Sequence, residues 1–167
     1  MNRRADGRRE DEAAFDWFFR AEYPAVLKTA YLVTHDREAA RDVTQEAFIQ
    51  LLRHWRKVSR YERPDAWVRR VAIRIAVRHS RKLRLQRSLE VEPVAPAYVP
   101  ADPDLMRELK GLPAMQRAAI VLFYFEDRPV SEIAEILDCA PSTAKVHLHR
   151  GRKNLAERLG EVSVDVV

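Results

Sequence analysis

The sequence is poor in the residues that cross-link a chain or break its helices. Its 167 residues include one cysteine, Cys139, and four glycines. A single cysteine excludes an internal disulfide and a zinc site made of several cysteines. Its apolar neighbours favour a small packed side chain over a reactive thiol. The scarcity of glycine and of alternating β-branched segments favours an all-helical fold.

Long apolar runs are absent as well. No stretch approaches the roughly 18 apolar residues that a transmembrane helix needs. The N-terminal stretch MNRRADGRREDEAAFDW has no apolar core of the kind found in signal peptides. We therefore expect a soluble, cytoplasmic protein without membrane insertion.

The sequence also lacks recognisable catalytic motifs. It has no glycine-rich phosphate loop, no His-Glu-x-x-His pair, and no serine or cysteine placed with a histidine and a carboxylate. Its five histidines are scattered, and the i, i+2 spacing of His147 and His149 puts them on different faces of a helix. We expect no catalytic residue, no cofactor and no metal site, and therefore a protein that is not an enzyme.

What the sequence does have is enough apolar residues for a core and a very uneven charge. Hydrophobic residues make up 47% of the chain, and its formal net charge is +5. Residues 1–56 are neutral, whereas residues 57–87 carry eleven cations against Glu62 and Asp65, a net charge of +9. So one-sided a block favours a polyanionic partner over an ordinary solvated surface.

A proline-rich segment divides the chain. Residues 86–104 hold four of the nine prolines and have no helical periodicity, so they predict a linker. Helical patterns lie on either side, at residues 11–85 and 105–160. The fold class that we expect is all-α, with two small helical domains joined by this linker.

The first block begins with two helical stretches. Apolar residues from Ala14 to Leu32 fit two short helices or one helix bent near Pro24. A helix from about Asp36 to Arg56 has an inner stripe and an opposite polar face. The inner stripe is Ala40, Val43, Ala47, Leu51 and Trp55, with Phe48 and Leu52 beside it, and the polar face is Asp42, Gln45, Glu46, Ile49 and Arg53. The apolar Ile49 at the centre of that face fits either a protein-docking surface or a lone exposed side chain.

A third helix begins near Pro64 and carries a stripe of arginines. The stripe is Trp67, Arg70, Arg74, Arg78 and Arg81. Four guanidinium groups in a row repel one another unless an anion lies across them, and a phosphate backbone is such an anion. The loop before the helix adds Lys57, Arg60, Tyr61 and Arg63, in which the tyrosine ring offers a base a stacking surface. Trp67 itself fits either a core anchor or a DNA contact, with the core anchor favoured.

The second block predicts a helix-turn-helix. Residues 112–126 are strongly apolar and predict the core helix of a small bundle. A shorter helix follows Pro129, with Ser131 as its N-cap. Its inward-facing residues are Ile133, Ala134, Ile136 and Leu137. The turn is Cys139-Ala140-Pro141, and the next helix starts near Ser142.

The last helix has an apolar seam and a basic outer face. The seam is Ala144, Leu148, Gly151, Leu155 and Leu159, where Gly151 allows close backbone packing. The candidate DNA contacts on the outside are Ser142, Thr143, Lys145, Val146, His149, Arg150, Arg152 and Lys153. Small and polar side chains come first, where a recognition helix meets base edges, and cations follow, where it meets phosphates. Val146 suits contact with a thymine methyl group.

Other functions fit the helical pattern too. Helical hairpins in protein-binding domains look alike, so a regulator that binds only proteins stays possible. A conventional helix-turn-helix repressor or activator would bind duplex DNA without polymerase and use the first block for dimerisation or effector binding. A regulator that binds only proteins would show no salt-dependent affinity for DNA, whereas a repressor or activator would show it.

Taken in order, three stretches resemble the extracytoplasmic-function (group IV) sigma factors, which are promoter-specificity subunits of bacterial RNA polymerase. Region 2.2 of that family is similar to DVTQEAFIQLLRHW, and regions 2.3 and 2.4 are similar to RPDAWVRRVAIRIAVRHSRK. Region 4 is similar to LPAMQRAAIVLFYFEDRPVSEIAEILDCAPSTAKVHLHRGRKNL. The likeness runs from about residue 13 to residue 160, and the last stretch is the most specific because it is long and includes the turn.

The resemblance implies a transcription initiation factor with three binding surfaces. Core RNA polymerase would bind the polar face Asp42, Gln45, Glu46, Ile49 and Arg53 through the clamp helices of its β′ subunit, and its β subunit would be a further partner. The −10 element of promoter DNA would be bound and melted, with one base flipped out, by Lys57, Arg60, Tyr61, Arg63, Trp67, Arg70, Arg74, Arg78 and Arg81. The −35 element would be read by the candidate contacts of the last helix.

The resemblance also implies a regulatory partner. Sigma factors of this kind are commonly held inactive by an anti-sigma protein wedged between the two domains, which a proline-rich linker would permit. Arg74 stands where many members carry asparagine, and His147 and His149 replace residues that are often arginine or aromatic. The promoter sequence is therefore not implied by the resemblance.

Overall fold

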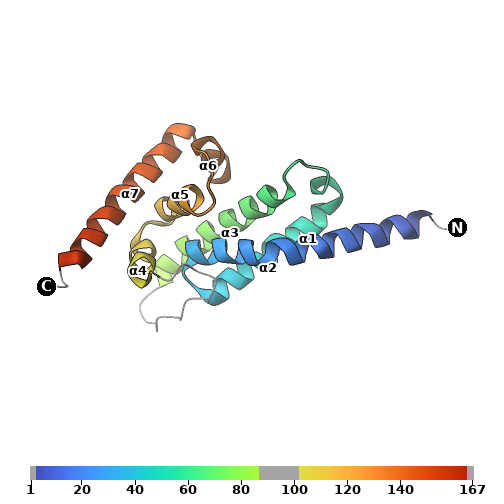
Figure 1. The fold of residues 1–167 in the computed structure, drawn as a ribbon, viewed down its shortest axis with the longest axis horizontal. Helices are drawn as coiled ribbons and strands as arrows, with labels where there is room; N and C mark the ends of the chain where they lie inside the picture. Colours follow the sequence, from blue (N-terminus) through green and yellow to red (C-terminus); the bar gives the residue numbers. More distant parts are fainter. Residues whose placement is uncertain (1–2, 87–101, 165–167) are drawn as a thin grey trace.

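The computed structural model describes residues 3–86 and 102–164, and in these ranges it consists of seven α-helices without a strand (Figure 1). The helices α1 to α3 come before the segment 87–101, which lies outside the described residues, and α4 to α7 come after it. The prediction of an all-α fold is confirmed. Most of the predicted linker therefore lies outside the described residues.

The first three helices pack against one another as a bundle. They are α1 (Arg3–Thr34), α2 (Arg37–Val58) and α3 (Pro64–Gln86). Apolar residues on both sides of Pro24 belong to one continuous helix α1, so the alternative of two short helices is wrong. The chain reverses between α1 and α2 at His35, which has a positive φ of 50°, and the carboxylate of Asp36 then caps α2 by accepting a hydrogen bond from the backbone N–H of Ala39.

The predicted division of α2 into an inner stripe and a polar face is confirmed. All five residues of the stripe are buried, as is Phe48. Leu52 is the exception, because 57% of its surface is exposed. It lies about 100° around the helix from the buried Leu51, beyond the arc of α2 that α1 and α3 cover. Placing Leu52 beside the inner stripe was therefore wrong.

The second group consists of three short helices followed by one long helix. These are α4 (Pro103–Gly111), α5 (Ala114–Tyr124), α6 (Val130–Ile136) and α7 (Pro141–Val164). Asp102 caps α4 with its side chain, so this helix starts inside the last residues of the predicted linker. Helix α6 begins at Val130 after Pro129, without a side-chain cap, and the prediction of Ser131 as its N-cap was wrong. Pro129, with extended backbone angles, occupies the N-cap position, and Ser131 is the second residue inside the helix.

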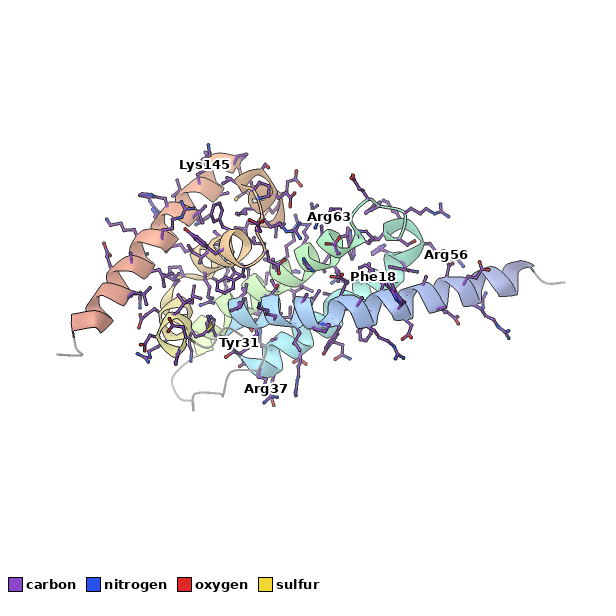
Figure 2. All side chains as sticks on the ribbon, viewed as in Figure 1. Phe18, Tyr31, Arg37, Arg56, Arg63 and Lys145 are labelled. Atoms are coloured by element: carbon purple, nitrogen blue, oxygen red, sulfur yellow. The ribbon has the colours of Figure 1, made fainter. Side chains whose placement is uncertain are left out.

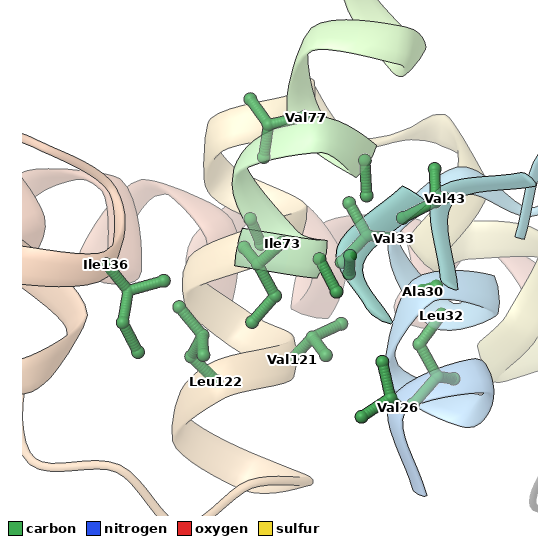
Figure 3. Close-up of a cluster of buried hydrophobic side chains, with 14 of the residues drawn as sticks. Val26, Ala30, Leu32, Val33, Val43, Ile73, Val77, Val121, Leu122 and Ile136 are labelled. Carbon is green, nitrogen blue, oxygen red and sulfur yellow. The ribbon is translucent and has the colours of Figure 1, made fainter. Parts of the chain in front are cut away.

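The two groups of helices share one hydrophobic core. Helix α5 packs on α6 and α7 and also on α1 and α3. In Figure 3 the α3 side chain Ile73 lies beside Val121 and Leu122 of α5, with Ile136 of α6 next to Leu122, and Val77 lies one turn further along α3. A helix that is apolar around most of its circumference is buried on several sides, and α5 is such a helix. The shared core therefore fixes the position and rotation of α3 relative to the helix-turn-helix.

Candidate nucleic-acid interface

The polar face of α2 lies on the surface as predicted. Asp42, Gln45 and Arg53 are exposed, and Ile49 between them has 37% of its surface exposed. Glu46 is half-buried and accepts a hydrogen bond of 3.0 Å from the side-chain amide of Gln50. The exposed Leu52 extends the apolar part of this surface beyond Ile49. This surface combines charge with two apolar side chains, a composition that suits contact with another protein.

The loop between α2 and α3 exposes its predicted cations. Lys57, Arg60 and Arg63 are exposed, as is Tyr61, at 42% of its surface, and Figure 2 shows Arg63 where the loop joins the start of α3. Arg63 forms an ion pair of 2.9 Å with Asp65 at the start of α3. Burial alone would raise the pKa of Asp65, but the hydrogen bond and charge of Arg63 outweigh it and lower that pKa. The ion pair thus fixes the base of an otherwise exposed basic loop.

Trp67 packs as a core anchor. Its ring is half-buried against the hydrophobic core, and it meets the imidazole of His54 edge-on with centroids 6.0 Å apart. Burial of an indole in this way stabilises the α2–α3 contact. The core-anchor interpretation of Trp67 is the one that fits this packing.

The arginine stripe of α3 lies against the helix-turn-helix. Arg70 forms an ion pair of 3.1 Å with Glu135 of α6. Arg74 donates two hydrogen bonds to backbone carbonyls at the end of α6, from Nε to Ile136 at 3.0 Å and from Nη2 to Glu135 at 2.8 Å. Carbonyl groups at a helix C-terminus carry partial negative charge. The second group of helices therefore supplies part of the negative charge that the stripe was predicted to require.

Arg78 and Arg81 continue the stripe beyond α6. Both are exposed, and Arg78 donates to the backbone carbonyl of Arg74 at 3.4 Å. Two hollows border these residues, and Arg81 lines both. Two of the four arginines of the stripe, Arg70 and Arg74, are thus bonded to α6. Arg78 and Arg81, at the other end of the stripe, border hollows at the junction between the two groups of helices.

A neighbouring arginine that the helical pattern does not mark forms an ion pair across this junction that is less exposed than the pair of Arg70 with Glu135. Arg69 bridges Glu22 of α1 at 2.9 Å and Glu126 after α5 at 3.1 Å. Glu126 also accepts a hydrogen bond from Thr29 of α1 and lies 3.9 Å from the buried Arg128. No periodicity could have paired Arg69 with a carboxylate 57 residues away. Glu126 itself stands out in the sequence, because it ends an otherwise apolar stretch. Nothing in the sequence, however, indicates that its partner is Arg69.

Helix α7 presents its predicted outer face to solvent. All eight candidate DNA contacts are exposed, with Val146 at 44%, and Figure 2 shows Lys145 on the outer side of the helix. The seam is buried at Ala144, Leu148 and Gly151 and half-buried at Leu155 and Leu159. A Cβ added at Gly151 would lie 2.9 Å from Cγ1 of Ile120, so this position requires glycine for the approach of α7 to α5.

Arg152 is the one candidate of this helix with strong partners inside the molecule. Its guanidinium lies over the rings of Phe123 and Tyr124, 4.7 Å and 5.5 Å from their centroids. Its Nε also donates a hydrogen bond of 2.8 Å to the hydroxyl of Tyr124. Such stacking holds the arginine in one orientation at the edge of the outer face. The other cations of the face, Lys145, Arg150 and Lys153, are exposed, and Lys153 lies 4.0 Å from the carboxylate of Glu157.

The described residues contain no group of three or more histidine, cysteine or carboxylate side chains that could hold a metal ion. Within the same residues, no helix is long and apolar enough to cross a membrane. Cys139 is half-buried in the turn before α7, where burial and then the charge of Asp138 raise the pKa of its thiol. A raised pKa disfavours the reactive thiolate, which agrees with a packing role.

Known proteins match both groups of helices in the same order. Sigma-70 region 2 matches residues 18–86, and sigma-70 region 4 matches residues 103–155. Among curated relatives, the sigma factor CarQ of Myxococcus xanthus is 29% identical over 99% of this chain and 99% of its own length. The extracytoplasmic-function sigma factor SigM of Mycobacterium tuberculosis is 27% identical over 93% of this chain and 82% of its own length.

A solved structure agrees with these relatives. The sigma factor RpoE of Bartonella quintana, crystallised with the anti-sigma factor NepR, is 26% identical and covers 88% of this chain and 97% of its own. The TM-score of the two structures is 0.66. With the region 2 and region 4 matches on the two groups of helices, the chain belongs to the sigma-70 family and, within it, to the extracytoplasmic-function sigma factors, which act in transcription initiation.

Proposed function

We propose that this sigma factor directs core RNA polymerase to promoters through three separate surfaces, on α2, on α3 with the loop before it, and on α7. The observation that carries the proposal is the exposure of all eight predicted contacts on one side of α7 while its seam is packed on α5. A helix held this way can enter a major groove without repacking its domain. The protein itself performs no chemistry, which belongs to the polymerase, and it acts in the cytoplasm.

Helix α7 is the proposed reader of the −35 element. Ser142, Thr143, Lys145 and Val146 lie in its first turns, where a recognition helix meets base edges. His149, Arg150, Arg152 and Lys153 follow where the phosphate backbone passes. Because phosphate contacts position the protein and base contacts specify sequence, the first turns set the preferred −35 sequence.

The loop at residues 57–63 and helix α3 are the proposed −10 surface. The exposed ring of Tyr61, beside exposed cations, suits stacking of an unpaired base. Arg70 and Arg74, in contrast, are bonded to α6. We propose that phosphates replace Glu135 and the α6 carbonyls when promoter DNA binds, which requires α3 and α6 to separate.

The polar face of α2 is the proposed contact for core polymerase. Ile49 and the exposed charges around it form a surface for the clamp helices of the β′ subunit, and the β subunit is a further contact of the sigma factor. Exposed Leu52 adds apolar area next to Ile49. Apolar side chains at the centre and charges at the rim are the usual composition of a protein–protein interface.

An anti-sigma protein is the proposed regulator. The support is the likeness to RpoE of Bartonella quintana, which was solved in complex with the anti-sigma factor NepR and matches 88% of this chain. Such a partner would act on the junction between the two groups of helices, where the arginine stripe lies.

Run-off transcription with bacterial core polymerase and a library of promoter fragments tests the proposed function. We expect specific transcripts that appear only when the protein is added, and their upstream sequences should share a −35 and a −10 motif. An Ile49→Asp variant should lose these transcripts while it keeps its affinity for duplex DNA. If the wild-type protein gives no transcript yet retains duplex DNA by itself, it is a stand-alone helix-turn-helix regulator and the −10 assignment fails.

A further inference from the structure

The junction between the two groups of helices encloses a basic cavity. Its volume is about 430 Å³, within the usual range of small-molecule pockets. Its walls come from the ends of α1 and α3, from the α4–α5 connection and from α7. The charged or titratable side chains in its lining are Arg81, Lys110, Arg117, His147 and Arg150, and no carboxylate of the described residues belongs to the lining.

Three of these cations have no ion-pair partner among the residues that the structure describes. Arg81, Lys110 and Arg150 form no ion pair with any of the described carboxylates. They come from α3, α4 and α7, so their convergence depends on the packing of the two groups of helices. Cations that converge without a counter-charge repel one another unless an anion lies between them.

The pKa of the His147 imidazole reflects the positive charge around the cavity. Its pKa is lowered, first by burial and then by the charges of Arg150 and Arg81. One of these arginines is on its own helix and the other is across the junction on α3. The excess positive charge therefore acts on a side chain between both groups of helices.

One wall of the cavity is rigid. Buried Arg117 donates hydrogen bonds from Nη1 to the backbone carbonyls of Lys110 at 2.9 Å and Leu112 at 3.2 Å. These bonds fix the connection between α4 and α5 that carries Lys110. The hydroxyls of Ser80 and Thr34 already donate to backbone carbonyls of α1 and, for Thr34, Asp36. Recognition in the cavity therefore falls to the cationic side chains.

We propose that this cavity binds a small molecule that carries two or more phosphate groups, such as a nucleoside polyphosphate, and that binding holds α3 against α7. A single phosphate group of about −2 charge would leave part of the charge of three cations uncompensated. A chain of phosphates matches both the charge and the volume. Arg81 and Arg150 are also candidate contacts for the −10 and −35 elements, so the site shares residues with the proposed promoter recognition, and the ligand would keep the arginine stripe packed on α6.

Calorimetric titration of the full-length protein with inorganic triphosphate, at constant ionic strength, tests the site. We expect saturable binding of one triphosphate per chain. Arg81→Gln and Arg150→Gln should each weaken it about tenfold or more, because each removes a charge-assisted hydrogen bond. The matched controls Lys82→Gln, next to Arg81 on α3, and Arg41→Gln, exposed on α2, should change the affinity less than about twofold.

Two further readouts separate the cavity from general basicity and from misfolding. Circular dichroism should show the wild-type helix content in all four variants. Triphosphate should raise the pKa of His147, followed by NMR, because an anion stabilises the imidazolium between Arg81, Lys110, Arg117 and Arg150. An unchanged His147 pKa places triphosphate elsewhere and overturns the proposal.

The source of the phosphate is tested in the same titrations. A DNA oligonucleotide without promoter sequence replaces triphosphate in a parallel series. If the oligonucleotide binds with the same dependence on Arg81 and Arg150 but triphosphate does not saturate, the cavity belongs to the DNA surface and the proposal is wrong. Equal losses in all four variants would overturn it as well, since they indicate a diffuse charge effect.

Discussion

At the scale of single residues, the close approach of α7 to α5 depends on the missing side chain of Gly151. A Cβ there would lie 2.9 Å from Ile120 and 3.2 Å from the backbone oxygen of Gln116. We expect Gly151→Ala to lower the free energy of unfolding by about 1–3 kcal/mol, the usual cost of overpacking. Gly160 has nothing within 4 Å of an added Cβ, so Gly160→Ala should be neutral or stabilising by up to about 1 kcal/mol. Urea unfolding of both variants checks this, and equal effects would contradict it.

His147 should make the stability of the protein depend on pH. Burial and the charges of Arg150 and Arg81 lower its pKa below the ordinary 6.5. As the pH falls below 6.5, the unfolded chain takes up a proton that the folded chain resists, so the free energy of unfolding decreases until the folded pKa is reached. His147→Gln should remove this part of the slope. Urea midpoints at several pH values measure it, and an unchanged slope in the variant would show that His147 is not its source.

The residue scale also shows what could be predicted from the sequence. Exposure of the α2 face and of the α7 outer face followed from helical periodicity, because each face repeats a simple pattern along one helix. The exposed Leu52 and the cap at Ser131 were mispredicted because both depend on what lies beside the helix. The bridge of Arg69 to Glu126 depends on tertiary packing, which no local pattern encodes.

At the scale of elements, the carboxylate of Glu126 joins three helices of the molecule. It accepts from Arg69 of α3 and Thr29 of α1 and lies near Arg128. Glu126→Gln leaves two cations facing a neutral amide, and we expect it to lower the free energy of unfolding by about 3 kcal/mol. A double-mutant cycle with Arg69→Gln should give a coupling of at least about 1 kcal/mol. Strict additivity of the two variants would contradict a shared network.

The outer face of α7 should account for a measurable part of the salt dependence of DNA binding. If Lys145 contacts one phosphate, Lys145→Gln should lower the magnitude of the log–log salt slope by about 1. Fluorescence anisotropy with a duplex that carries the −35 motif measures the slope. Lys82→Gln, on α3, is the control and should leave the slope for this duplex unchanged. A lower slope in both variants would move the contact away from α7.

At the scale of the whole molecule, α3 and α6 hold the two groups of helices together through contacts that DNA would compete for. Glu135 is largely exposed and pairs with Arg70, so Glu135→Lys adds repulsion without disturbing the core. We expect it to lengthen the distance between dyes on α2 and α7 and to strengthen binding of −10 single-stranded DNA several-fold. Glu12→Lys, exposed on α1, makes the same charge change far from the junction and should do neither. If both variants bind the single-stranded DNA more strongly, the cause is the change in net charge and not the opening of the junction.

The packing of the two groups of helices is the part of the fold that the sequence pattern indicated least. The proline-rich segment separates the two groups along the chain. The helical periodicity of either block does not indicate which helices of the other block it packs against. The apolar surroundings of Val121 and Leu122 on α5 were a usable signal, because a helix that is apolar on several sides needs more than one partner. That signal was interpreted as the core of one small bundle, whereas α5 also packs on α1 and α3.

The hydrogen bonds of Arg74 end on backbone oxygens of residues 135 and 136 and not on their side chains. Any amino acid at those two positions offers the same carbonyl groups, provided that α6 keeps its path. These two hydrogen bonds therefore depend on the path of α6 and on the side chain at position 74. The side chains at positions 135 and 136 are constrained separately, by the ion pair of Glu135 with Arg70 and by the burial of Ile136. The acceptors of this contact are backbone carbonyl groups, which depend on the path of the helix end. Only the donor, the side chain of Arg74, depends on the identity of one residue.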